Sequence, residues 1–264
     1  MLRPLRIAAV SALIIVGVQL TVWVVGCNNW NANGFFINVS TLHVRTCLII
    51  GADVNVRDER GRTPLHNSAA LNSWGTAQAG NIEVLIANGA DITVKDVDGL
   101  VPLQLTIWSN FQNSAVIEAL TFPDVDIEAR KNGLTALLRA ADYSRAEVIK
   151  ALLAAGADMN ARVDYSDSRF QSHMPGFTLL HVAARNPSPG GPGVVDLLIR
   201  EGMDVNARDE QGDTPLHAAV STDWKRPGGV DVLMALINAG ADISARNQNG
   251  ELPVDRADSY FSGN

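Results

Sequence analysis

Five histidines, two cysteines and a recurring set of aspartates are the residues of this chain that could do chemistry. A histidine beside a carboxylate or hydroxyl can transfer protons, and histidines with cysteines can hold a metal ion. His66, His181 and His217, however, each follow a leucine in the same short block, and repetition in register is typical of architecture. We therefore predict that each of these imidazoles bridges the backbone of adjacent turns.

The other candidates lack the partners that catalysis or metal binding needs. His43 and His173 have no neighbouring metal-ligand spacing, and no serine lies in a nucleophile-elbow context. The glycine-rich run 188–193 lacks the Lys-Ser/Thr pair of a phosphate-binding loop and is interpreted as a turn. The sequence thus predicts a chain that is not an enzyme, with no catalytic residues, no cofactor and no metal site. The aspartates that recur at one register are interpreted as solvated turn residues: Asp53, Asp91, Asp158, Asp204 and Asp242.

The blocks that carry the histidines belong to a repeating unit. Its first mark, Gly-x-Thr-Pro-Leu-His, is complete at 61–66 and 212–217, and weaker copies begin at Gly99, Gly133, Gly176 and Gly250. Successive leading glycines are 38, 34, 43, 36 and 38 residues apart. Such recurrence indicates a stack in which each unit packs on its neighbours. A second mark, Gly-Ala-Asp or Gly-Met-Asp, begins at Gly51, Gly89, Gly156, Gly202 and Gly240.

Each unit predicts two helices and a hairpin-like finger. The Thr-Pro pair suits a helix start, because threonine can cap the helix and proline tolerates the first turn. A second helix follows with apolar residues at helical spacing, as at Val148, Ile149, Leu152 and Leu153, and stops at a glycine. Twelve residues then lead from the cap glycine to the next threonine position, as from 51 to 63.

At these residues the chain resembles the ankyrin-repeat family, from about Ser40 to Ala257. The resemblance implies an all-α solenoid of helix-turn-helix units with hairpin-like fingers, here preceded by one apolar N-terminal helix. We expect the second repeat to be the least regular, because Asp124 stands where the cap glycine is expected. The expected boundaries are 1–27 for a signal peptide, lipoprotein signal or membrane anchor, 28–39 for a polar tether, 40–57 for a capping half-repeat, 58–257 for about five repeats plus a terminal half-repeat, and 258–264 for a C-terminal tail.

The N-terminal segment is a separate element. Arg3 and Arg6 precede an apolar run from Ile7 to Gly26, which as a helix would be about 30 Å long and could cross a bilayer. We expect the repeats to be exported to the periplasmic side of a bacterial cell envelope, membrane-anchored rather than soluble. Three fates stay open: a lipoprotein with lipid on Cys27, since 24–27 resembles a lipobox, an uncleaved anchor, and ordinary cleavage. A Cys27–Cys47 disulfide is a further alternative, which lipidation of Cys27 would exclude.

Partner binding is expected on the concave face of fingers and first helices, because the resemblance implies a protein partner there. The net charge of −7 argues against nucleic acid. The finger between the third and fourth repeats has ten extra residues within 163–175 and carries side chains typical of interfaces, although a tolerated surface insertion is the alternative. The predicted partner-binding residues are Tyr165, Arg169, Phe170, His173 and Met174 in this long finger, Trp108, Arg139, Tyr143 and Arg185 on first helices, and Trp74 and Trp224 in two helix-to-helix loops.

The sequence therefore predicts a non-catalytic protein-binding scaffold with an unidentified protein partner. More specific versions are a periplasmic immunity-type toxin binder and a protective accessory of an envelope enzyme. A hydrolase that uses the insertion as a lid is the alternative from another class, and a structural spacer is a third. A row of basic residues on the fingers is interpreted as the family's pattern, with steering of an acidic partner as its alternative: Arg57, Lys95, Arg130, Arg162, Arg208 and Arg246.

Overall fold

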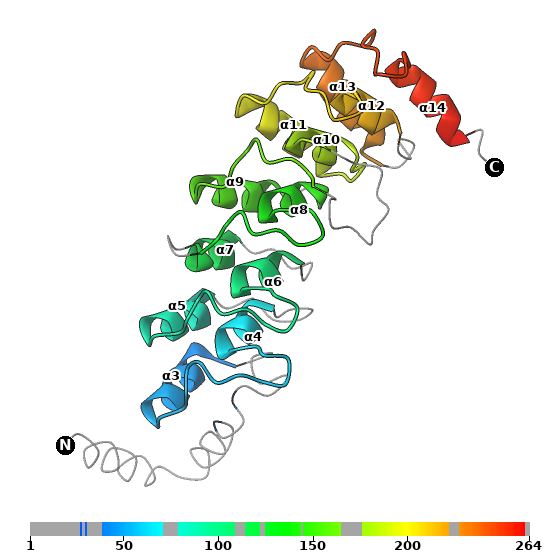
Figure 1. Cartoon of the computed structure of the whole chain (residues 1–264). Helices are drawn as coiled ribbons and strands as arrows, with labels where there is room; N and C mark the ends of the chain where they lie inside the picture. Colours follow the sequence, from blue (N-terminus) through cyan, green and yellow to red (C-terminus); the bar gives the residue numbers. More distant parts are fainter. Residues whose placement is uncertain are drawn as a thin grey trace. The chain divides into compact units, whose positions relative to one another are not determined.

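The computed structural model describes residues 27, 30, 39–70, 79–108, 114–121, 125–143, 145–164, 176–221 and 227–261. Within these ranges the regular elements are helices, and the one β-type pairing is an isolated bridge between Lys131 and Leu134. The chain divides into two compact units, Met1–Asp126 and Ile127–Asn264, which are described separately. The all-helical repeat architecture expected from the sequence is confirmed (Figure 1).

The first unit contains a lone second helix followed by two helix pairs. First helices pack on first helices and second helices on second helices, so α4 lies beside α6 while α3 and α7 flank α5 (Figure 1). Leu65, Ile82 and Ile117 are fully buried between them, and each such side chain contributes about 1.5–3 kcal/mol. The helices are α3 (Thr41–Ile49), α4 (Pro64–Ala70), α5 (Ala79–Ala87), α6 (Pro102–Trp108) and α7 (Ser114–Leu120).

The second unit continues the same arrangement. The first helices α8, α10, α12 and α14 contact one another in that order, and α11 lies between α9 and α13. Thr135 and Thr178 cap α8 and α10 through their side-chain oxygens, as predicted from the repeat. The helices are α8 (Ala136–Asp142), α9 (Ala146–Ala154), α10 (Leu179–Ala184), α11 (Gly191–Arg200), α12 (Pro215–Val220), α13 (Gly229–Asn238) and α14 (Pro253–Phe261).

The second helices end as their sequence predicts. Gly156 after α9 and Gly202 after α11 have φ angles of 90° and 97°, in the left-handed region that other residues rarely adopt. In each case the N–H of the residue after the glycine donates to a carbonyl near the helix end, for example Ala157 to Leu152 at 3.0 Å. The glycine therefore turns the chain from the second helix into the finger.

The repeated histidines join each repeat to the next one, which confirms their predicted bridging role. His66, His181 and His217 are buried at the starts of their helices. Their Nε2 atoms lie 3.0, 2.9 and 3.1 Å from backbone oxygens of the following unit, those of Leu100, Asp213 and Glu251. A carbonyl oxygen can only accept, so Nε2 carries the proton and Nδ1 accepts from the N–H of the capping threonine.

Burial makes His66 and His181 resist protonation. Desolvation lowers the pKa of His181 from 6.5 to about 4 and also lowers the pKa of His66. Between these pH values the unfolded chain takes up a proton that the folded chain does not. The stabilisation that His181 contributes is therefore complete above pH 6.5 and is lost as the pH falls through about 4.

The substitution His181→Gln should flatten this pH dependence. Gln104 occupies the same register in the second repeat, where its side-chain oxygen accepts from Val101 N–H at 3.2 Å, so the fold accommodates glutamine there. Between pH 7 and pH 5 the native chain should lose about 2 kcal/mol of unfolding free energy through His181, and the variant should lose about that much less. Urea denaturation at the two pH values measures the difference.

The matched control is His43→Gln, because that imidazole is only half-buried and lies in the other unit. It should leave the pH dependence of the second unit unchanged. An identical loss of stability in native chain and His181→Gln would contradict the assignment of a neutral, bridging imidazole.

Candidate functional site

The long finger keeps the base of an ordinary finger. Val163 N–H donates to Phe177 O at 2.9 Å, and Gly176 N–H donates to Val163 O at 3.2 Å. In the first repeat, Gly61 N–H donates to Asp58 O in the same way at 2.9 Å. The ordinary turn thus runs from 58 to 61 and the long one from 163 to 176, so all ten extra residues are inserted inside the turn.

Seven of the predicted contact residues lie outside the described residues and stay predictions. Five belong to the long finger and two to helix-to-helix loops: Tyr165, Arg169, Phe170, His173, Met174, Trp74 and Trp224. Trp108 is half-buried at the end of α6, in the first unit. The other three candidates, Arg139, Tyr143 and Arg185, belong to the second unit.

Arg139 and Tyr143 form a compact cation–aromatic pair at the end of α8. The guanidinium carbon lies 4.4 Å from the centre of the Tyr143 ring, and Nη2 donates to the tyrosine hydroxyl. Nη1 also makes an ion pair with Asp142 Oδ2 at 2.9 Å, and 23% of the Arg139 side chain stays exposed. Three contacts thus hold a partly exposed guanidinium in one orientation.

Arg185 lies at the base of the long finger. Its guanidinium carbon is 5.9 Å from the centre of the Phe177 ring, and Phe177 directly follows the glycine that closes the finger. The Phe177 ring is buried and lies 5.0 Å from the His181 ring, which fixes its position on α10. Arg185 therefore connects α10 with the point where the insertion ends.

A hydrogen bond from a side chain links the end of α10 to the end of α8. Asn186 Nδ2 donates to the backbone oxygen of Asp142, and α8 packs directly on α10. The structure thus brings the predicted residues Arg139, Tyr143 and Arg185 onto two neighbouring helices and their C-terminal caps, and Arg185 contacts Phe177 at the base of the long finger. We refer to Arg139, Asp142, Tyr143, Phe177, Arg185 and Asn186 as the α8–α10 cluster.

The basic row on the fingers has a structural role. Arg130 Nη1 donates to Arg162 O at 2.7 Å, Arg162 Nη1 to Arg208 O at 2.9 Å, and Arg208 Nη1 to Arg246 O at 2.7 Å. Each arginine therefore ties its finger to the backbone of the next one. This confirms the interpretation of the row as part of the repeat pattern.

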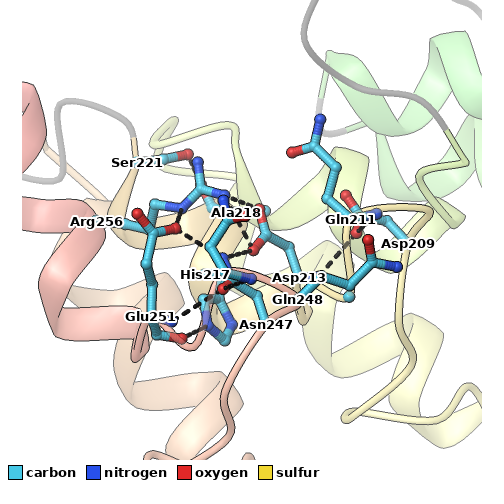
Figure 2. Close-up of polar contacts among 12 residues, drawn as sticks. Asp209, Gln211, Asp213, His217, Ala218, Ser221, Asn247, Gln248, Glu251 and Arg256 are labelled. Carbon is cyan, nitrogen blue, oxygen red and sulfur yellow. Dashed lines mark hydrogen bonds and ion pairs between the residues drawn. The ribbon is translucent and has the colours of Figure 1, made fainter.

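A second polar cluster joins the last fingers to α14 (Figure 2). Asp213 accepts from Asn247 Nδ2 at 2.8 Å and forms an ion pair with Arg256 at 2.9 Å. Arg256 also pairs with Glu251 at 3.0 Å, and Asn247 donates to the same carboxylate at 2.8 Å. These bonds account for the positions of the charged side chains, so the cluster is interpreted as a structural clamp.

Asp209 is the exception in this second cluster. Its Oδ1 accepts from the N–H groups of Gln211 and Asp213, both at 2.8 Å, whereas Oδ2 is buried and accepts no hydrogen bond from the described part of the chain. In the first finger the corresponding oxygen of Asp58 accepts from Asn67 Nδ2 at 3.3 Å, and Ala218 stands where that asparagine would be. Burial consequently raises the pKa of Asp209.

Cys27 is bonded to Cys47, and both cysteines are buried. The structure thus contains the disulfide alternative. A thioether-linked lipid on Cys27 would require the same sulfur, so the two states exclude each other, and the predicted lipidation is not carried into the proposals below. Residues 1–26 lie outside the described residues. Within the described ranges, the helices are all too short or too polar to span a bilayer.

One group of metal-ligand side chains was missed in the sequence. The sulfurs of Cys27 and Cys47 and a ring nitrogen of His43 lie within 4.8 Å of one another. The prediction that His43 has no neighbouring metal-ligand spacing is therefore wrong. The available signal was that His43 and Cys47 are four residues apart, which places them on one face of α3.

Comparisons with known proteins agree with this repeat architecture. A family model described as ankyrin repeats (3 copies) matches residues 74–163 and 165–247. Rabankyrin-5 of Mus musculus is 31% identical over 164 residues, 61% of this chain and 12% of that protein. The B-cell lymphoma 3 protein homolog of Mus musculus is 27% identical, over 67% of this chain and 37% of that protein. This chain therefore spans much less than two thirds of either mouse relative.

A bacterial relative and two solved structures complete the comparison. The putative ankyrin repeat protein YahD of Escherichia coli (strain K12) is 28% identical over 67% of this chain and 81% of its own length. The ankyrin repeat domain of Bcl-3 aligns with a TM-score of 0.60 and 26% identity, covering 84% of this chain and 92% of that domain. The human ASB11 ankyrin repeat domain has a TM-score of 0.61 and 23% identity, covering 82% and 86% respectively, and so shows the fold alone.

The substitution Asp209→Asn should stabilise the chain at neutral pH. The next finger already has asparagine at this place, where Asn247 Nδ2 donates to Glu251, and Asp213 stands at the same spacing from position 209. The amide oxygen would still accept from the N–H groups of Gln211 and Asp213, and the amide nitrogen would replace the unpaired Oδ2 with a donor. We expect the free energy of unfolding to rise by about 1 kcal/mol. The stability that Asp209 contributes is present below pH 3.8 and is lost as the pH rises through its raised pKa, so the gain should shrink in acid.

The control is Asp96→Asn, at the same register of an earlier finger. Asp96 has its own partner, Arg62 Nε at 3.3 Å, so losing the charge there should destabilise the chain. Chemical denaturation of both variants gives the two signs. A loss of stability in both would show that Asp209 has a partner in solution.

Proposed function

Because this chain belongs to the ankyrin-repeat family, whose domains typically mediate protein–protein interaction, we propose that it binds a protein partner through the α8–α10 cluster and the long finger. Relatives in this family are generally non-catalytic interaction scaffolds. The observation that carries the proposal is the pairing of Arg139 with Tyr143 on α8, which packs on α10, the helix that follows the insertion.

The cluster has the composition of an interface centre. Arginine and tyrosine dominate the residues whose truncation costs most in protein complexes. Arg139 loses little conformational freedom on binding, because Asp142 and Tyr143 already hold its guanidinium. Its exposed edge can still donate hydrogen bonds to a carboxylate or carbonyl of the partner.

The long finger extends this surface. Its closing bonds at Val163 and Gly176 lie next to Phe177, which contacts Arg185 of the cluster. Side chains on the insertion therefore start from the same edge of the second unit as the cluster. A partner seated on the cluster would meet the finger, whose Tyr165, Arg169 and Phe170 are suited to burial in an interface.

We place the binding domain on the periplasmic side of a bacterial envelope. The support from sequence is the apolar run after Arg3 and Arg6, which has the length of a membrane helix. The support from structure is the Cys27–Cys47 disulfide, since disulfides form and persist in oxidising compartments.

Two triple-alanine variants test the binding surface. Tyr165→Ala with Arg169→Ala and Phe170→Ala removes the finger's large side chains, and Arg139→Ala with Tyr143→Ala and Arg185→Ala removes those of the cluster. Each should lower recovery of the cross-linked partner from membrane-extracted full-length chain at least about tenfold, because interface centres concentrate binding energy. Circular dichroism and the melting temperature should change little.

The matched control removes an exposed ion pair on a second helix, Glu147 with Lys150 at 2.9 Å. The double variant Glu147→Ala with Lys150→Ala should recover the partner as the native chain does. Undiminished recovery with both triple variants would refute the proposed surface.

Intact mass spectrometry of the chain extracted from membranes tests its compartment. We expect a mass without an acyl adduct that increases by two hydrogens on reduction, because Cys27 and Cys47 are joined. A diacylglyceryl adduct on Cys27 would rule out the disulfide in the mature chain. Two thiols in chain isolated under rapid alkylation would contradict the oxidising compartment.

A further inference from the structure

We propose that Cys27, His43 and Cys47 form a redox-gated binding site for a thiophilic divalent cation of the Zn²⁺ type. In the oxidised chain the two sulfurs are joined and His43 lies beside them. In the reduced chain the same three side chains supply two thiolates and an imidazole. The site is separate from the proposed protein-binding surface.

The ligand atoms already lie close to the spacing that a metal needs. Zn–S bonds of about 2.3 Å and Zn–N bonds of about 2.0–2.1 Å in tetrahedral geometry separate the ligand atoms by roughly 3.5–3.8 Å. The two sulfurs and the ring nitrogen all lie within 4.8 Å of one another. Reduction would break the S–S bond and let the two sulfurs separate to the distance that a shared metal ion needs. The Cα atoms of Cys27 and Cys47 are 5.2 Å apart, so both side chains can reach the same ion.

The backbone that carries these ligands is well supported. Ser40 caps α3 by accepting from His43 N–H at 3.2 Å, so the first turn that carries His43 is anchored. Cys47 is fully buried where α3 packs on α5. Trp30, three residues after Cys27, is only 4% exposed, and Cys27 itself is 6% exposed, so both side chains are buried.

Reduction and metal binding proceed in two balanced steps. A dithiol reductant donates two electrons and two protons to the disulfide, which becomes two thiols while the dithiol becomes a disulfide. Zn²⁺ then displaces one proton from each thiol and takes the lone pair of the His43 ring nitrogen, with water in the fourth position. A disulfide oxidant reverses the sequence: it takes two electrons from the two thiolates and becomes a dithiol, Cys27 and Cys47 are joined again, and the metal is released.

With this site the chain has a cross-link in both redox states. Residues 27 and 47 close a loop with a sequence separation of 20, and a covalent closure stabilises the fold mainly by restricting the unfolded chain. A metal bridge would restrain the same loop when the disulfide is absent. The position where the apolar N-terminal segment ends thus stays fixed to α3.

Cobalt titration of the full-length chain in detergent is the direct test. After reduction by a dithiol and its removal under anaerobic conditions, Co²⁺ should bind with one equivalent per chain. The spectrum should show thiolate-to-cobalt charge transfer from two sulfurs and the visible bands of tetrahedral cobalt, and Zn²⁺ should displace the signal. The oxidised chain should give no such signal. No charge-transfer band in the reduced chain, or equal binding by the oxidised chain, would overturn the proposal.

His43→Gln is the decisive variant, because it keeps both cysteines and their disulfide. It should weaken Co²⁺ binding at least about tenfold, as loss of one of three protein ligands requires. Arg45→Ala, an exposed position on the same helix, should bind as the native chain does. Cys47→Ser should abolish the charge-transfer band, with circular dichroism confirming its fold. Unchanged affinity in His43→Gln would exclude the imidazole and refute the site.

Discussion

The stack depends on side-chain hydrogen bonds from one repeat to a backbone carbonyl of the next. The histidines make them from the helix starts, with Nε2 of His181 on Asp213 O, and the arginines make them on the fingers, with Nη1 of Arg208 on Arg246 O. Asp213 O also accepts from Asp209 N–H at 3.0 Å, so the histidine fills the second acceptor position of a carbonyl that closes the finger turn. Apolar burial drives the helices together, but these directional bonds set the register in which they stack.

Because neighbouring repeats are joined at the base of each finger, the length of the turn beyond the base can vary. The long finger shows this directly: the bonds at Val163 are those of an ordinary finger, although the turn contains ten extra residues. Loop closure costs little for added length, so the insertion is tolerated without disturbing the helices. The inserted turn and the ends of the helices can therefore carry large apolar and cationic side chains without weakening the stack. A binding surface at these positions can evolve independently of the core.

The sequence predicted what repeats and missed what occurs once. The helix order, the capping threonines and the bridging of His66, His181 and His217 follow from residues that recur in register. Arg139, Tyr143 and Arg185 could be chosen by register as well, but the contact of Arg139 with Tyr143 depends on rotamers that no pattern encodes. The unpaired oxygen of Asp209 could have been predicted only by comparing Ala218 with its counterpart Asn67, which donates to the corresponding oxygen of Asp58. The approach of Cys27 to His43 joins the segment before the repeats to the capping half-repeat, so periodicity gives no information about it.

The first and last described helices need other restraints, because each lacks a described neighbour on one side. At α3 this restraint is a covalent bond from Cys27 to Cys47. At α14 the restraint is ionic, since Arg256 pairs with both Asp213 and Glu251. These partly exposed ion pairs contribute little individually, whereas closing the loop at α3 contributes about 3 kcal/mol. The firmer restraint is thus located at α3, the first described helix, where closure of the loop fixes residue 27 to the helical stack.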